Sequence, residues 1–175
     1  MWREIAAVEG MQDLSRLESN IRRLIAQRAC LNHGVALAEK IPGPFLELGL
    51  GNGRSFDHLR EIAPSREIFV FERRPQPHPE CMPDSKHLIV GDLESTLIGS
   101  LSWLPQRAAM IHSDIGTGDI ERNERIAEWL SETLPDLVAC SGIVISDQPL
   151  TSANLRLSEP PEGDISDRYF LYCRI

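Results

Sequence analysis

Short apolar runs alternate along the chain with segments of helical periodicity. From Met11 to Lys40 apolar residues recur every three or four positions, which predicts a long amphipathic helix. The tripeptide Asn32-His33-Gly34 is expected to break or kink this helix. Residues 41–44, Ile-Pro-Gly-Pro, cannot continue it, because proline lacks an amide hydrogen and glycine is a poor helix former.

Beyond this segment the pattern predicts strands and helices in turn. The predicted strands are short and almost entirely apolar: 45–48, 68–71, 88–90, 108–112 and 142–145. Helices are predicted between them, over about 55–63, 94–103 and 120–134. Apolar strands separated by helices are typical of a parallel sheet covered on both faces. We therefore expect an α/β fold with a doubly wound, mainly parallel sheet.

Two segments depart from this alternation. The connection between the second and third strands contains Pro75, Pro77, Pro79 and Pro83, which forbid a regular helix and predict an irregular loop. Near the end of the chain, residues 148–168 are predicted as a loop, and Tyr169–Cys173 has the aromatic and apolar content of a strand. We expect this last strand to be antiparallel to the others.

Length and charge narrow the possibilities further. A chain of 175 residues predicts one domain, 1–175, with residues 1–43 as a helical N-terminal extension and 44–175 as the core. The formal net charge of −8 disfavours a nucleic-acid partner. No apolar stretch approaches the roughly 20 residues that span a bilayer, so no membrane partner is expected. The four cysteines form no C-x-x-C pair, which predicts reduced thiols in a cytoplasmic protein.

A glycine-rich turn follows the first predicted strand, with the sequence Glu47-Leu48-Gly49-Leu50-Gly51-Asn52-Gly53. Alternating glycines let a ligand approach the backbone closely. Ligands of doubly wound sheets bind at the carboxyl ends of the strands, which favours a ligand site over a plain turn. The dinucleotide fingerprint G-x-G-x-x-G would need glycine where this chain has Arg54, which disfavours NAD.

The G-x-G-x-G spacing, with an acid two residues before the first glycine, resembles the first motif of class I S-adenosylmethionine-dependent methyltransferases. The resemblance extends over about 44–147 and the last strand. It implies a Rossmann-like core and S-adenosyl-L-methionine as cofactor. It also implies that Glu72 accepts hydrogen bonds from the ribose hydroxyls and that Asp92 faces the adenine, although Asp92 could equally, or also, cap the next helix. The predicted cofactor-binding residues are Glu47, Gly49, Gly51, Asn52, Gly53, Glu72, Arg73, Asp92 and Leu93.

The predicted catalytic residues are His112, Asp114 and Asp147, at the ends of the fourth and fifth strands. His112 is either a general base or a packed core residue. The two aspartates also resemble the metal-binding pair of catechol-type O-methyltransferases, which implies a divalent metal. That family has asparagine where this chain has Gln148, so we expect no metal and keep Asp114, Asp147 and Gln148 as the alternative ligand set.

These features predict in-line methyl transfer to a small-molecule acceptor. After the fourth strand the chain has Ser113-Asp114-Ile115-Gly116 in place of the proline-rich motif of amino-group methylases, and it lacks the Pro-Cys nucleophile of cytosine-ring methylases. The acidic surface favours neutral or cationic acceptors. Arg22, Arg23 and Arg28 on the first helix either hold an acceptor carboxylate or form a solvated face. Two alternatives are a non-catalytic S-adenosylmethionine-binding protein and a nicotinamide-dependent oxidoreductase. A homo-oligomer is possible.

Overall fold

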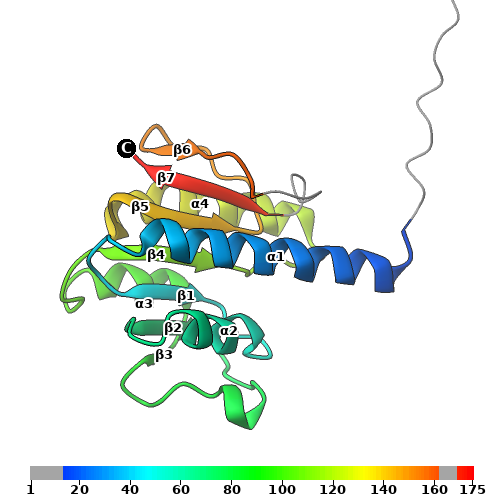
Figure 1. Ribbon diagram of the computed structural model, residues 1–175, viewed down its shortest axis with the longest axis horizontal. Helices are drawn as coiled ribbons and strands as arrows, with labels where there is room; N and C mark the ends of the chain where they lie inside the picture. Colours follow the sequence, from blue (N-terminus) through cyan, green and yellow to red (C-terminus); the bar gives the residue numbers. More distant parts are fainter. Residues whose placement is uncertain (1–13, 162–168) are drawn as a thin grey trace, which may run out of the picture.

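The computed structural model describes residues 14–161 and 169–175, which form a seven-stranded sheet covered by helices (Figure 1). In space the strands follow the order β3-β2-β1-β4-β5-β7-β6. β1 to β5 are parallel, whereas β7 is antiparallel to both β5 and β6, which confirms the predicted α/β fold and its antiparallel last strand. The strands are β1 (Phe45–Leu48), β2 (Ile68–Glu72), β3 (Leu88–Val90), β4 (Ala108–Ser113), β5 (Val138–Ser146), β6 (Leu155–Leu157) and β7 (Phe170–Arg174).

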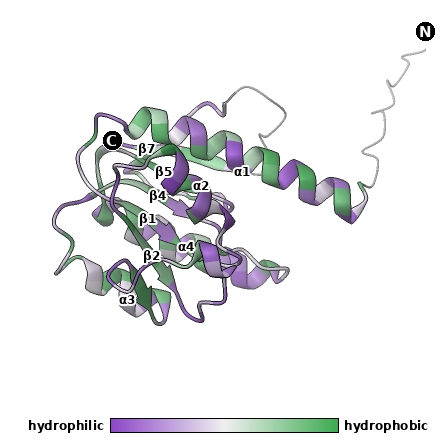
Figure 2. Cartoon of the chain, turned by 60° about the horizontal axis from the view of Figure 1, so that its bottom comes forward, coloured by the Kyte–Doolittle hydropathy of each residue, from purple (hydrophilic) through white to green (hydrophobic). Residues whose placement is uncertain are grey.

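Helices α1 (Arg16–Ala38) and α2 (Arg54–Ile62) cover one face of the sheet, and α3 (Leu93–Ser100) and α4 (Ile120–Leu137) cover the other. Each face has its own apolar core. Ala26 and Cys30 of α1 pack with Met110 on the first face, and Leu130 and Leu134 of α4 pack with residues of the strands on the second. Hydrophobic and hydrophilic residues are interspersed along α1 (Figure 2), and its buried residues Ala26, Cys30 and Gly34 recur every four positions on one face.

The predicted break in the first helix is wrong, because α1 continues without interruption through Asn32, His33 and Gly34. A Cβ at Gly34 would lie 2.6 Å from Ile145 Cδ1 and 3.1 Å from Met110 Sδ. The glycine therefore allows α1 to approach the sheet closely. Residues 11–13 of the predicted helix lie outside the described residues.

The proline-rich connection between β2 and β3 is irregular, as predicted, and contains only the short 3-10 helix Pro79–Cys81. It packs beside the glycine-rich turn. The amide of His78 donates a hydrogen bond to the carbonyl oxygen of Asn52 (3.2 Å), and the Arg60 guanidinium of α2 donates one to the carbonyl oxygen of Glu80 (2.5 Å). The connection thereby forms a wall of the turn.

Two boundaries near the end of the chain differ from the prediction. The segment predicted as a loop contains the short strand β6, in which Leu155 is buried and the next two residues are exposed. A strand of three residues shows no detectable alternation, and its pairing with β7 defines it. α4 also extends through Pro135 to Leu137, and β5 begins at Val138, four residues before the predicted strand.

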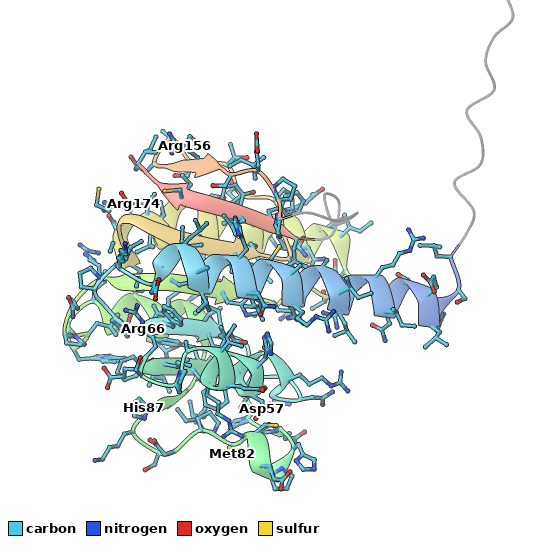
Figure 3. All side chains as sticks on the ribbon, in the orientation of Figure 1. Asp57, Arg66, Met82, His87, Arg156 and Arg174 are labelled. Carbon is cyan, nitrogen blue, oxygen red and sulfur yellow. The ribbon has the colours of Figure 1, made fainter. Side chains whose placement is uncertain are left out.

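Arg66 fixes the end of α1 against the start of β1 (Figure 3). Its guanidinium lies 4.8 Å from the centre of the Phe45 ring. It also donates hydrogen bonds to four carbonyl oxygens, those of Ala38, Glu39, Ile41 and Gly43. This contact fixes where the chain leaves the helix and enters the central strand.

All four cysteines are free thiols, and burial raises the pKa of Cys30 to about 11. Among the helices of the described ranges 14–161 and 169–175, none has the length and apolar content needed to cross a membrane.

Candidate functional site

The turn between β1 and α2 contains three glycines with positive φ angles, +88° at Gly49, +49° at Gly51 and +83° at Gly53. A Cβ at Gly49 would lie 2.7 Å from Ile115 Cγ2, and one at Gly53 would lie 2.5 Å from the Cβ of Cys81. A Cβ at Gly51 would meet nothing within 4 Å. Protein neighbours therefore exclude a side chain at Gly49 and Gly53, whereas the space beside Gly51 is open to a ligand.

The carboxylate of Glu72, at the end of β2, holds this turn in place. Its Oε2 accepts hydrogen bonds from the amides of Leu50 (2.8 Å) and Gly51 (3.4 Å), and its Oε1 accepts one from the amide of Arg74 (2.9 Å). Burial alone would raise the pKa of Glu72, but these amides outweigh it and lower the pKa. Glu72 is therefore an ionised acceptor beside the open face of Gly51, with lone pairs left for a ligand.

A cavity of about 580 Å³ opens at the carboxyl ends of the strands, within the usual size range of small-molecule sites. Five of the predicted cofactor-binding residues line it: Gly49, Glu72, Arg73, Asp92 and Leu93. Its apolar wall is built from Phe71, Leu93, Ile115, Ile126 and Trp129. The lining does not include the predicted residues Glu47, Gly51, Asn52 and Gly53, although the last three belong to the turn beside it.

Asp92 caps a helix, which was one of the two roles that the sequence left open for it. It is the N-cap of α3, and its side chain accepts a hydrogen bond from the amide of Glu94 (3.2 Å). The same residue lines the cavity. Its contact with adenine stays a prediction.

The Glu47 carboxylate points into the protein and not into the cavity. Glu47 of β1 lies opposite His112 of β4, and its Oε2 is 2.7 Å from His112 Nδ1. Both side chains are completely buried, and the Ser55 hydroxyl donates a hydrogen bond to the other oxygen of Glu47. Burial alone would lower the pKa of His112, but the attraction of Glu47 outweighs it and the pKa is raised.

The two predicted catalytic aspartates lie close to His112 but have different partners. Asp114 accepts hydrogen bonds from Arg23 (3.1 Å) and from Gln27 (2.8 Å) of α1. Asp147 Oδ2 accepts one from the amide of Gly116 (2.8 Å), and burial together with the charge of Asp114 raises the pKa of Asp147. Asp114 is thus paired with Arg23 of α1, whereas the pKa of Asp147 is raised.

Several polar atoms around this cluster are buried without a hydrogen-bond partner of ordinary geometry among the described residues. They are His112 Nε2, Ser113 Oγ, Asp147 Oδ1 and the hydroxyl of Tyr169. The Tyr169 ring stacks on His112, with 6.1 Å between ring centres. An unpaired buried polar group costs about 1–3 kcal/mol, so a group of them at the ends of β4 and β5 favours a polar ligand there.

The alternative metal ligands Asp114, Asp147 and Gln148 stay a prediction. In residues 14–161 and 169–175 no group of three or more His, Cys, Asp or Glu side chains could hold a metal ion. The Gln148 amide nitrogen donates a hydrogen bond to Asp147 Oδ2 (3.1 Å). Of the arginines singled out on α1, Arg23 binds Asp114 and Arg22 forms an ion pair with Glu18.

Sequence reasoning missed two groups of site residues. Gln27 and Tyr169 reach the aspartates from α1 and from the start of β7, and only the fold brings these segments together. On α4, Arg122, Arg125 and Trp129 line the cavity. Their spacing of three and four residues places them on one helix face, which is a signal in the sequence that could have found them.

Comparisons with known proteins agree with this geometry. The profile of a family described as S-adenosyl-L-methionine methyltransferase matches residues 14–174. The structure is similar to an S-adenosyl-L-methionine methyltransferase from Silicibacter pomeroyi DSS-3, with 38% identity, a TM-score of 0.88, and coverage of 93% of this chain and 99% of that one. No curated protein matches.

More distant structures share the fold. Human methyltransferase-like protein 13, in complex with SAH, is 15% identical with a TM-score of 0.51, and the match covers 89% of this chain and 82% of that one. A putative caffeoyl-CoA O-methyltransferase from Staphylococcus aureus is 14% identical with a TM-score of 0.50, covering 92% and 84%.

Proposed function

Because the chain belongs to the S-adenosyl-L-methionine methyltransferase family, we propose that it transfers the methyl group of this cofactor to a small-molecule acceptor by in-line displacement. The observation that carries the proposal is the open face of Gly51 beside the ionised Glu72 and a cavity of about 580 Å³. The methyl group of bound S-adenosyl-L-methionine is already activated, so the protein contributes mainly by positioning the two reactants.

The cofactor fits the residues around the turn. Glu72 offers acceptor lone pairs for the ribose hydroxyls, and Asp92 and Leu93, which follow the neighbouring strand β3, suit the adenine. The backbone of Gly49, Gly51, Asn52 and Gly53 forms the turn against which the rest of the molecule lies, and Arg73 borders the same cavity. Glu47 supports this site from inside the protein, through Ser55 at the start of α2.

The acceptor is proposed to bind at the ends of β4 and β5. Asp114 and Asp147 are partly exposed there, and a hydroxyl or amine of the acceptor would satisfy the unpaired Oδ1 of Asp147. His112 is the proposed base, because Glu47 fixes its Nδ1 as the hydrogen-bonded nitrogen and leaves Nε2 to take a proton. Its raised pKa strengthens the imidazole as a proton acceptor.

The parts outside the catalytic core are small, which favours a small-molecule acceptor over a macromolecule. Helix α1 and residues 148–161 are the proposed substrate-recognition parts, and the rest of the predicted loop, 162–168, lies outside the described residues. The single-domain organisation, the cytoplasmic location, the lack of nucleic-acid and membrane partners, and the possible homo-oligomer stay predictions.

The activity can be tested by incubating the protein with S-adenosyl-L-methionine and an extract of small metabolites, and by measuring S-adenosylhomocysteine. Product formation that disappears in Glu72→Ala would support the proposal. If S-adenosylhomocysteine binds but no extract yields turnover, the protein is a cofactor-binding protein without transfer activity. Binding of NADH, measured by tryptophan fluorescence, in place of S-adenosylhomocysteine would instead favour an oxidoreductase.

A further inference from the structure

Four arginines line the cavity and come from two of its walls. Arg73 and Arg74 follow β2 directly, and Arg122 and Arg125 lie on the first two turns of α4. The two helix residues are three positions apart, so they share a face with Trp129, which also lines the cavity. The arginines therefore belong to one concave surface with an apolar base.

The guanidinium groups of these arginines have no hydrogen-bond or ion-pair partner among the side chains and backbone of residues 14–161 and 169–175. Three carboxylates, those of Glu72, Asp92 and Glu94, line the same cavity. The first is bound to backbone amides and the second caps α3. The arginines are thus available to a ligand.

The cofactor does not account for this charge. Its adenosine half, which the proposed function places against Glu72, Asp92 and Leu93, carries no anionic group. Its one carboxylate belongs to the amino-acid half, which the proposed function places against the glycine turn. The local charge also contrasts with the formal net charge of −8, which by itself favours neutral or cationic acceptors. Guanidinium groups match phosphate and carboxylate oxygens in pairs of hydrogen bonds, and they do so better inside a cavity than on an open surface.

We propose that Arg73, Arg74, Arg122 and Arg125 bind a phosphate or carboxylate group of the methyl acceptor. This inference rests on the proposed function and narrows its substrate to an anionic small molecule. The acceptor would lie across the bound cofactor, with its charged group against α4 and its nucleophile toward the ends of β4 and β5.

The test uses inorganic pyrophosphate and citrate as probes in calorimetric titrations of the full chain, with and without saturating S-adenosylhomocysteine. We expect one molecule of probe to bind in the presence of S-adenosylhomocysteine. In the double variant Arg122→Gln/Arg125→Gln its affinity should fall at least about 10-fold, while the affinity for S-adenosylhomocysteine stays within about two-fold. The stronger of the two probes names the anionic group.

A control variant removes the same charge elsewhere. Arg107→Gln/Arg156→Gln changes exposed residues before β4 and on the edge strand β6, where Figure 3 shows Arg156. It should bind the probe like the wild type. Equal losses in both double variants, or competition between probe and S-adenosylhomocysteine, would overturn the proposal. Tighter binding of a single-stranded RNA than of either small probe would also overturn it, in favour of a nucleic-acid substrate.

Because S-adenosylhomocysteine is titrated separately, the two proposals fail in different ways. Missing S-adenosylhomocysteine binding contradicts the proposed function, whereas intact binding without an arginine-dependent anion site contradicts only this inference. Methyl transfer to the fraction of a metabolite extract that an anion-exchange resin retains would support the inference. Transfer restricted to the unretained fraction would contradict it.

Discussion

The glycines of the turn allow binding to be separated from folding. At Gly51, alanine would keep a left-handed φ of +49° but touch nothing within 4 Å. The cost to stability is that of the backbone conformation alone, about 1–2 kcal/mol. At Gly49, alanine has the same type of backbone cost, and its Cβ also meets Ile115 at 2.7 Å. Overpacking adds about 1–3 kcal/mol, so Gly49→Ala should be the less stable variant.

For cofactor binding, in contrast, a substitution at Gly51 should have the larger effect. Leucine at position 51 would fill the space beside the turn where the cofactor is proposed to lie, so Gly51→Leu should bind S-adenosylhomocysteine at least about 10-fold more weakly, equivalent to about 1.4 kcal/mol. Its melting temperature should fall by only about 2–8 °C, the consequence of about 1–2 kcal/mol in a chain of this size. Calorimetric titration measures the affinity, and thermal unfolding measures the melting temperature.

Gly99→Ala is the control, because a Cβ at Gly99 in α3 also meets nothing within 4 Å and the position is helical. It should stabilise the protein by about 0.5–1 kcal/mol and leave binding unchanged. Wild-type affinity in Gly51→Leu would refute the assignment of the open space to the cofactor. Equal destabilisation by Gly51→Ala and Gly49→Ala would refute the packing argument.

Four further predictions concern charged or titratable residues. Glu72→Ala removes the acceptor of three amides, two of them in the glycine turn, and should weaken S-adenosylhomocysteine binding at least about 10-fold in a calorimetric titration. Glu47→Gln removes the charge of a fully buried carboxylate that is hydrogen-bonded to His112 and Ser55, and should lower the free energy of unfolding by about 1–3 kcal/mol in urea. Because the folded-state pKa of His112 is raised, its stabilising effect is complete below about pH 6.5 and is lost as the pH rises through that pKa. As the pH rises above about 6.5, the stability of the wild type should therefore fall more steeply than that of His112→Asn. Arg66→Met should cost about 2–4 kcal/mol, since four carbonyl oxygens lose a charged donor, whereas Arg107→Met, at an exposed position, should change unfolding by less than about 0.5 kcal/mol.

The sequence predicted the order of the elements because nearly every core strand is apolar and every helix is periodic. Its error at Gly34 arose because a glycine that packs against a sheet and one that ends a helix look the same without the neighbours Ile145 and Met110. The strand β6 escaped detection because three residues are too few for a pattern.

Within the site, motif spacing located the glycine turn and the acidic strand ends, since these lie within a few residues of each other along the chain. It could not predict the direction of the Glu47 side chain, because the register of Glu47 opposite His112 depends on the pairing of β1 with β4. Gln27 and Tyr169 join Asp114 and Asp147 only through the tertiary fold.

The contact of Gly53 with Cys81 has a practical consequence for protein engineering. A Cβ at Gly53 would lie 2.5 Å from the Cβ of Cys81 and 3.0 Å from the Cβ of Pro77. The glycine-rich turn and the proline-rich connection therefore pack against each other without room for an added side chain. Grafting either segment alone into a related scaffold should fail, and exchanging residues 47–54 together with 73–83 should succeed. In recombination libraries of this family, residues 47–54 and 73–83 should therefore be inherited from the same parent sequence.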